Sequence, residues 1–202
     1  MTKAVVHLID DDEAVRDSLA FLLTTAGLAS RTYDSAVAFL DELASASPGC
    51  VVTDIRMPDM NGLELVRRLK DRGAPHPIIV ITGHGDVPLA VEAMKAGVVD
   101  FLEKPFDDEA LLGSIRSALA IGDQAARLGE ERRKFETMLA SLSPRENDVL
   151  KGVLAGKQNK VIAFELGISA RTVEVYRANV MTKTAAGSLS ELVRMALLAG
   201  GL

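Results

Sequence analysis

The chain has 202 residues, 48% of them hydrophobic, and a net charge of −5, a size that suits two domains with ordinary buried cores. No apolar run approaches the about 18 residues that a membrane span needs, and the first apolar stretch ends in acidic residues, unlike a signal peptide. The single cysteine, Cys50, excludes an internal disulfide, and we expect it to be a small buried hydrophobe. The composition predicts a cytoplasmic protein that makes no contact with membranes.

The charge is divided unevenly along the chain. Residues 1–120 hold 11 Lys and Arg against 19 Asp and Glu, residues 121–140 hold four of each, and residues 141–202 hold eight basic against five acidic groups. Opposite signs predict different partners, a cation or cationic protein for the first part and a polyanion for the last. The basic excess is too small to establish DNA binding by itself.

Short apolar runs alternate with helical patterns over residues 1–120, the first predicted domain. The candidate strands are Val5–Ile9, Ser30–Tyr33, Val51–Thr53, Ile78–Thr82 and Val99–Leu102. Nearly continuous apolar strands between helices indicate a parallel sheet that is covered on both faces. We therefore predict an α/β fold, a five-stranded doubly wound parallel sheet with its ligand site at the carboxyl ends of the strands.

The remaining residues predict only helices. Residues 121–140 carry mixed charges without a strand signal or proline, which predicts a helical linker that is exposed or partly exposed. Residues 141–202 show helical patterns with short breaks at Gly156, Gly167 and Gly187. Four short helices in this length predict an all-α helix-turn-helix domain.

Carboxylates follow two of the predicted strands. Asp10–Asp12 come directly after the first strand, and Asp54 comes after the third. Side by side, these groups would repel each other unless a hard cation such as Mg²⁺ bound them. The fourth strand ends at Thr82 and the fifth leads to Lys104, a hydroxyl and a cation at the same edge. The set predicts a site at which an aspartate accepts a phosphoryl group.

The segments LIDDDE, VVTDIRMPDMNG and IIVITGHGDVPLAVEAMKAGVVDFLEKPF resemble the flavodoxin-like receiver domains of two-component response regulators. The resemblance covers roughly residues 4–120 and implies that Asp54 is the phosphoacceptor. It also implies four Mg²⁺ ligands: Asp11 directly, Asp10 mainly through water, Asp54 itself and the main-chain carbonyl of Arg56.

The same resemblance assigns residues that respond to the phosphoryl group. It implies that Thr82 and Lys104 hold phosphoryl oxygens and that the Lys104–Pro105 peptide bond is cis. Phe101 matches an aromatic residue that moves inward on activation as Thr82 moves toward the phosphoryl group. Asp12 is an additional acid, for which we predict only helix capping and a contribution to the local field.

The segment from LSPRENDVL to RMALLAG resembles the LuxR/GerE-type helix-turn-helix over its whole length. With a receiver before it, the chain is similar to the NarL/FixJ class of response regulators, and within that class to FixJ-like proteins. The residues agree with this, because Ser143 and Pro144 suit the start of one helix and Ser169 suits the cap of the next, Ala170–Thr184. We expect the latter helix to enter the major groove.

Helical geometry predicts which residues of this segment contact DNA. Val173, Val180 and Thr184 form the inward stripe of the helix. The opposite face predicts base contacts, with Val175 and Ala178 suited to thymine methyls and Glu174 to a cytosine amino group. The whole predicted set is Arg171, Glu174, Val175, Ala178 and Thr182, flanked by Lys160, Thr172, Asn179 and Lys183 for the phosphates. Arg177 suits either a structural ion pair or a DNA contact.

The function implied is transcription regulation. A histidine kinase would phosphorylate Asp54 with Mg²⁺ as cofactor, and the chain would then form a homodimer on a DNA operator with two half-sites, with RNA polymerase as a further partner. Slow self-dephosphorylation is the only enzymatic activity expected. One alternative is a Mg²⁺-dependent phosphohydrolase of the haloacid dehalogenase type that uses Asp10, although this gives Asp54 no role. Another is a receiver that acts through protein contacts alone, against which the exposed apolar pair Val175 and Ala178 argues.

Several surfaces are candidates for pairing. Leu128, Phe135 and Leu142 recur every seven residues, which suits either a weak helical joint between copies or packing on the chain's own domains. We expect activated receivers to pair through residues 86–103, and the last helix to pair DNA-binding domains through Leu189, Leu192, Val193 and Ala196. His7 and His84 lack partners at metal-ligand spacing, so we predict no metal site at either.

Overall fold

The computed structural model describes residues 4–83 and 87–200, which form two compact units, Met1–Ala126 and Arg127–Leu202. His84 and Asp86, at the start of the expected pairing surface, lie outside the described residues. Among the described residues, no helix is long and apolar enough to cross a membrane.

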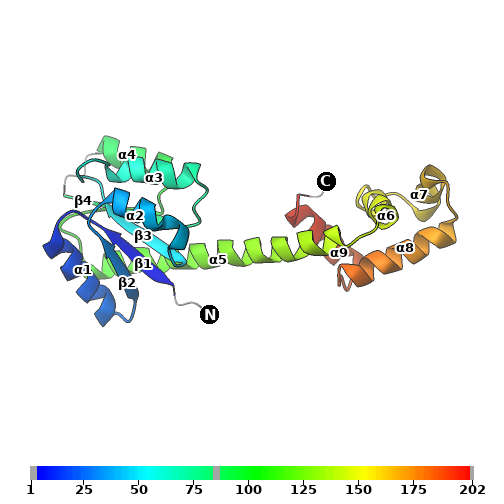
Figure 1. Ribbon diagram of the computed structural model, residues 1–202, viewed down its shortest axis with the longest axis horizontal. Helices are drawn as coiled ribbons and strands as arrows, with labels where there is room; N and C mark the ends of the chain where they lie inside the picture. The colour runs from blue at the N-terminus through cyan, green and yellow to red at the C-terminus, as the bar shows by residue number, and fades with distance from the viewer. Residues whose placement is uncertain (1–3, 84–86, 201–202) are drawn as a thin grey trace. The chain divides into compact units, whose positions relative to one another are not determined.

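A five-stranded parallel sheet in the order β2-β1-β3-β4-β5 forms the centre of the first unit (Figure 1). Its strands are β1 Val5–Ile9, β2 Ala29–Tyr33, β3 Gly49–Asp54, β4 Ile78–Thr82 and β5 Asp100–Glu103. The doubly wound parallel sheet expected from the sequence is confirmed. The third strand extends beyond Val51–Thr53 at both ends, because Gly49 and Asp54 also pair with neighbouring strands although neither is apolar.

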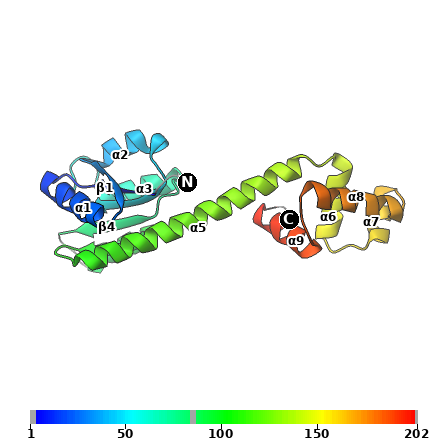
Figure 2. The same cartoon turned by 90° about the horizontal axis from the view of Figure 1, so that it is seen from below.

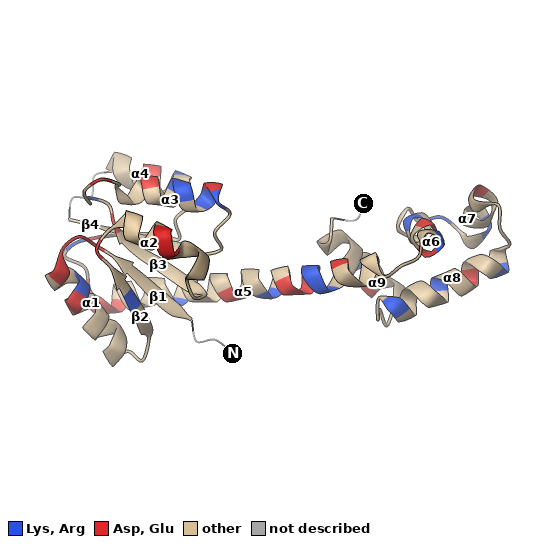
Figure 3. Cartoon of the chain, viewed as in Figure 1, with Lys and Arg blue, Asp and Glu red and all other residues tan. Residues whose placement is uncertain are grey.

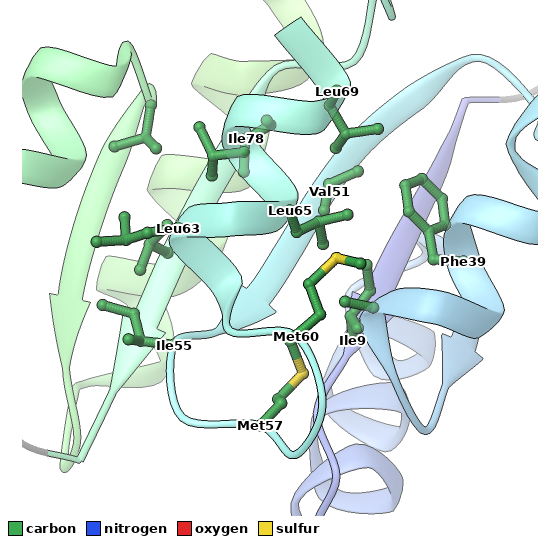
Figure 4. Packing of buried hydrophobic residues seen from close by; sticks show 14 of the residues in the cluster. Ile9, Phe39, Val51, Ile55, Met57, Met60, Leu63, Leu65, Leu69 and Ile78 are labelled. Atoms are coloured by element: carbon green, nitrogen blue, oxygen red, sulfur yellow. The ribbon is translucent and has the colours of Figure 1, made fainter. Parts of the chain in front are cut away.

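Helices cover both faces of this sheet. They are α1 Glu13–Thr25, α2 Ala36–Glu42 with the 3-10 turn η1 Leu43–Ser45, α3 Gly62–Asp71, α4 Val87–Ala96 and α5 Asp108–Ala140. Alternate strand residues enter two cores, so that Val51 packs with α2, α3 and α4 whereas Val52 packs with α1 and α5. Figure 4 shows the first core, to which Met57 and Met60 of the loop after β3 belong together with Ile9 and Phe39.

Two buried residues of the sheet have structural roles. Cys50 is fully buried, as predicted, and burial raises the pKa of its thiol to about 12. His7 lies in the core, where its Nε2 donates to the carbonyl of Ser47 at 2.9 Å and its Nδ1 lies 3.3 Å from the hydroxyl of Tyr33. Burial lowers the pKa of His7, which favours the neutral form of the ring in this core.

The second unit contains four short helices in its described part, as expected: α6 Pro144–Leu154, α7 Asn159–Leu166, α8 Ala170–Lys183 and α9 Leu189–Leu198 (Figure 2). Ser143 caps α6 in a reciprocal capping box with Glu146, and Ser169 caps α8. Val173 and Val180 of α8 are buried in two separate clusters, and Thr184 is also buried. The predicted inward stripe of this helix is confirmed.

The predicted linker is not a separate segment. Residues 121–140 continue α5, whose 33 residues contribute to both units. Phe135 is buried, and Met138, Leu139 and Leu142 pack around the same cluster of the second unit. The apolar stripe of the linker therefore packs on its own unit at Phe135 and Leu142, while Leu128 stays exposed.

Candidate functional site

Two carboxylates and one ammonium group meet at the carboxyl ends of the strands. Asp10 follows β1 and is 3% exposed, and Asp54 ends β3 and is 6% exposed. The Nζ atom of Lys104 lies 2.8 Å from Oδ2 of Asp10 and 2.9 Å from Oδ1 of Asp54. We call these three residues the strand-end site. Acidic residues follow one another along the chain where β1 passes into α1 (Figure 3).

Main-chain groups orient both carboxylates. The N–H of Arg56 donates to Oδ2 of Asp54 at 2.6 Å, and the N–H of Asp12 donates to Oδ1 of Asp10 at 3.0 Å. Asp12 also caps α1, as predicted. Arg16 was not among the residues expected at this site, yet its Nη1 donates to the carbonyl of Asp10 at 2.7 Å. Its only signal in the sequence was its position near the start of the helix that follows Asp10.

A glycine allows α3 to begin directly against Asp54. A Cβ atom on Gly62 would lie 2.2 Å from the carbonyl oxygen of Asp54, a distance that no side chain tolerates. Asn61 caps α3 by accepting from the N–H of Glu64, and the N–H of Gly62 donates to the carbonyl of Ile55. The loop is thereby closed tightly behind the phosphoacceptor candidate, and Met57 and Met60 anchor it in the core.

The charge of Lys104 depends on the two aspartates. Burial alone would lower the pKa of Lys104, but its hydrogen bonds to Asp10 and Asp54 outweigh burial, so the pKa lies above its ordinary value. Lys104 therefore stays protonated and offsets the repulsion between the carboxylates. Its N–H donates to the carbonyl of Thr82, and its peptide bond with Pro105 is cis, as expected.

The other candidate residues surround this site. Thr82 is fully buried at the end of β4, and Phe101 of β5 is partly buried against the first core. Asp11 and Arg56 are exposed. Within residues 4–83 and 87–200, no three acidic, histidine or cysteine side chains gather closely enough to form a metal site by themselves. The donors that do converge, the carboxylates of Asp10 and Asp54, are hard oxygen ligands, and two of them suit Mg²⁺, which usually keeps several waters.

A second candidate site lies on α8. Its exposed side carries Arg171, Glu174, Val175, Ala178 and Thr182, which we call the reading face. Val175 is 54% exposed although it is apolar. Lys160 and Asn179 beside this face are exposed, and Thr172 is half-buried with its hydroxyl 2.8 Å from that of Ser169.

Two basic residues of α8 have partners inside the second unit. Arg177 donates to Oδ1 of Asn159 at 2.6 Å, so it makes a structural hydrogen bond rather than an ion pair. Lys183 donates to Oε2 of Glu146 at 2.7 Å. Glu146 was missed as a functional candidate because it has the pattern of an ordinary first-turn acid of α6.

The two surfaces expected to pair copies of the chain, on α4 and on α9, differ in how many of their apolar residues are exposed. On α4, Val87, Val91 and Met94 are exposed and form an apolar patch. On α9, the expectation was partly wrong, because Leu192 and Ala196 are buried in the core of their own unit. Only Leu189 and the partly exposed Val193 of that set remain accessible.

Comparison with known proteins places both units in families. Residues 6–116 match the response regulator receiver domain, and residues 140–196 match the bacterial regulatory proteins of the LuxR family. The transcriptional regulatory protein FixJ of Bradyrhizobium diazoefficiens is 56% identical over 201 residues, covering 100% of this chain and 98% of that protein.

Solved structures agree with these matches. The response regulator StyR is 41% identical with a TM-score of 0.84, covering 97% of this chain and 99% of that one. Full-length FixJ from B. japonicum is 55% identical with a TM-score of 0.61, covering 100% of both chains. The phosphohydrolase alternative built on Asp10 is not supported, since the matched proteins are regulators.

The receiver match, the LuxR-type match and the relatives that span the whole length lead to one conclusion. The chain belongs to the response regulators that join a receiver to a LuxR-type helix-turn-helix domain, and it is a phosphorylation-dependent transcription regulator.

Proposed function

We propose that Asp54 accepts the phosphoryl group and that a sensor histidine kinase is the donor. The observation that carries this is the strand-end site, where the Nζ atom of Lys104 lies within 2.9 Å of the carboxylates of Asp10 and Asp54. An oxygen of Asp54 attacks the phosphorus atom, and the bond from phosphorus to the histidine nitrogen breaks. The nitrogen leaves with the electron pair, and the product is an acyl phosphate.

The residues around Asp54 position the transferred group. Lys104 is a cation on a flexible stem, so it can turn from the carboxylates to a phosphoryl oxygen while it remains charged. Thr82 offers a hydroxyl from the end of the neighbouring strand. The donor set fits Mg²⁺ through Asp10, Asp11, Asp54 and the carbonyl of Arg56, and Mg²⁺ would offset the charge of the phosphoryl oxygens. Slow hydrolysis of the acyl phosphate by water would return the chain to its resting state.

Phosphorylation then alters the region between Thr82 and Lys104. The added negative charge attracts the Thr82 hydroxyl, and Phe101 moves into the space that this leaves. The α4 patch of Val87, Val91 and Met94 lies in the same region and pairs activated receivers. The dimer places two DNA-binding units on an operator with two half-sites, where RNA polymerase is a further partner.

Substitution of Asp54 tests the central assignment. We expect Asp54→Asn to gain no acid-labile phosphate from acetyl phosphate and Mg²⁺, since the amide lacks the nucleophilic oxygen. Asp41→Asn is the matched control, because Asp41 lies on α2 away from the strand ends, and it should be labelled like the unsubstituted chain. Intact mass spectrometry and acid lability measure the product. Labelling of Asp54→Asn at the unsubstituted rate would show that the assignment is wrong.

A further inference from the structure

Lys183 is the last residue of α8 and makes two contacts with the start of the DNA-binding domain. Its Nζ atom donates to Oε2 of Glu146 at 2.7 Å and lies 3.4 Å from the carbonyl oxygen of Ser141. Glu146 belongs to the first turn of α6, and Ser141 follows directly after α5. One ammonium group therefore joins the C-terminal end of α8 to the joint between α5 and α6.

Glu146 is a rigid anchor for this contact. Its side chain is 5% exposed, against 41% for Lys183. The N–H of Ser143 donates to the same Oε2 atom at 2.7 Å, and the N–H of Glu146 donates to the Ser143 hydroxyl at 3.3 Å. This capping box holds the carboxylate whether or not the lysine is present.

The ion pair resists being opened. The hydrogen bonds to Lys183 and Ser143 lower the pKa of Glu146 to about 2, so the carboxylate is charged at any physiological pH. If Lys183 turned to a DNA phosphate, this buried charge would be left without its cation, which is costly in a partly desolvated site. Lys160, which is exposed on α7, can reach a phosphate without such a cost.

We infer that Lys183 is a positioning residue for DNA binding, which holds α8 against α6 through Glu146, and that it does not contact the phosphate backbone. The inference rests on the proposed function, because it takes α8 as the helix that reads the bases. It replaces the role expected for Lys183 from its place beside the reading face. The pair sets the angle of α8 at the end nearest α5, while Arg177 and Asn159 hold the helix nearer its middle.

The two roles predict opposite results in DNA binding. If Lys183 bound a phosphate, Lys183→Met would lower the salt dependence, log K against log salt, by about 0.9 and would weaken binding to all sequences alike. If Lys183 is a positioning residue, the substitution leaves this slope unchanged and lowers the preference for the operator over scrambled DNA by about tenfold, the effect of one good base contact.

Glu146→Gln distinguishes the two roles of Lys183, because each role predicts a change of opposite direction in DNA affinity. Glutamine keeps an acceptor for the N–H of Ser143 but removes the charge that holds Lys183. If Lys183 positions α8, this variant loses operator preference as Lys183→Met does. If Lys183 is held back from a phosphate, release from Glu146 raises the affinity for every sequence.

The experiment uses the full chain treated with acetyl phosphate and Mg²⁺. Its DNA is the sequence that the unsubstituted chain enriches from a randomised duplex library, beside a scrambled duplex, and fluorescence anisotropy at several salt concentrations measures both. Lys160→Met is the control for a phosphate contact, and Lys183→Arg, which keeps a donor for Glu146, should recover most of the preference. Thermal unfolding confirms that each variant is folded at the temperature of the assay.

The outcomes are distinct. Reduced operator preference with an unchanged salt slope in Lys183→Met, together with weaker operator binding by Glu146→Gln, supports the inference. A lower slope in Lys183→Met, an unchanged preference, or tighter binding by Glu146→Gln overturns it. A lack of any sequence preference in the unsubstituted chain would instead contradict the proposed function, and that result is obtained before any variant is made.

Discussion

At the scale of single residues, the exposed apolar side chain of Val175 needs an explanation. Val175 and Ala178 are exposed on a helix whose other side is buried, and Glu174 is exposed on the same face. Small apolar groups suit thymine methyls, and a carboxylate accepts a hydrogen bond from a cytosine amino group. The reading face therefore exposes, at three positions, groups that suit two kinds of base contact.

Substitutions on this face should change base preference. We expect Val175→Ala and Glu174→Gln each to alter the preference at one operator position, by about 1–3 kcal/mol. Enrichment of DNA from a randomised library by each variant measures the profile. Leu197→Ala is the control, since Leu197 is exposed and apolar but lies on α9. Profiles that stay unchanged in both reading-face variants would contradict the placement of α8 on the bases.

At the scale of elements, Glu146 at the start of α6 makes the stability of the second unit depend on pH in the acidic range. The pKa of Glu146 is about 2 in the folded chain against an ordinary value of 4.5, so folding favours its charged form. Its contribution to stability is complete above pH 4.5 and is lost as the pH falls from 4.5 toward 2. In this pH range we expect α6 and α8 to unfold first, because the Glu146–Lys183 pair joins them.

Removal of the carboxylate should remove that part of the pH dependence. We expect Glu146→Gln to be less stable than the unsubstituted chain near neutral pH, with a difference that shrinks as the pH falls below 4.5. Urea unfolding followed by NMR signals of α6 and α8 measures this. Glu165→Gln, in the exposed pair with Lys157, is the control and should change little. A constant difference between Glu146→Gln and the unsubstituted chain at all pH values would refute the assignment.

Much of the fold followed from apolar patterning. The strands Val5–Ile9 and Ile78–Thr82 were predicted with their observed bounds, because buried parallel strands are continuous apolar runs. That Asp10 and Asp54 lie close together followed from the same geometry. The sequence could not show that Lys104 bridges them, since only the folded sheet brings these residues within hydrogen-bond distance.

The sequence misled in two places about what a helix side contacts, and for the same reason. Leu192 and Ala196 have the same pattern as a surface for pairing, yet α9 turns them into the core of its own unit. Lys183 lies beside the reading face by helical angle, but its partner Glu146 is 37 residues earlier in the chain. A helical pattern identifies an apolar or charged side of a helix, and only tertiary structure determines what that side contacts.

At the scale of the whole molecule, activation should change the oligomeric state. The α4 patch exposes Val87, Val91 and Met94, and the proposed phosphorylation of Asp54 would reshape the adjoining region between Thr82 and Lys104. We expect the resting chain to be mainly monomeric and the chain treated with beryllofluoride and Mg²⁺ to dimerise. Sedimentation velocity measures the two states, and NMR shifts of residues 82–104 report the change at Thr82 and Phe101.

Substitutions at two exposed apolar positions, one on α4 and one on α1, test where the dimer interface lies. Val91→Asp should abolish dimerisation because it places a charge in the α4 patch, whereas Phe21→Asp, on the exposed side of α1, should leave it intact. A stable dimer before activation would contradict this scheme. So would a chain that remains monomeric after activation even on operator DNA.

The burial of Cys50 has a practical consequence for measurements on this protein. Its thiol is fully covered and its pKa is about 12, so maleimide and iodoacetamide reagents find almost no thiolate while the chain is folded. A second cysteine placed on an exposed residue of either unit would consequently react alone, without removal of the native one. Pairs of such cysteines, one in each unit, would carry fluorescent or spin labels, and the distances between them would test whether treatment with beryllofluoride changes the separation of the units.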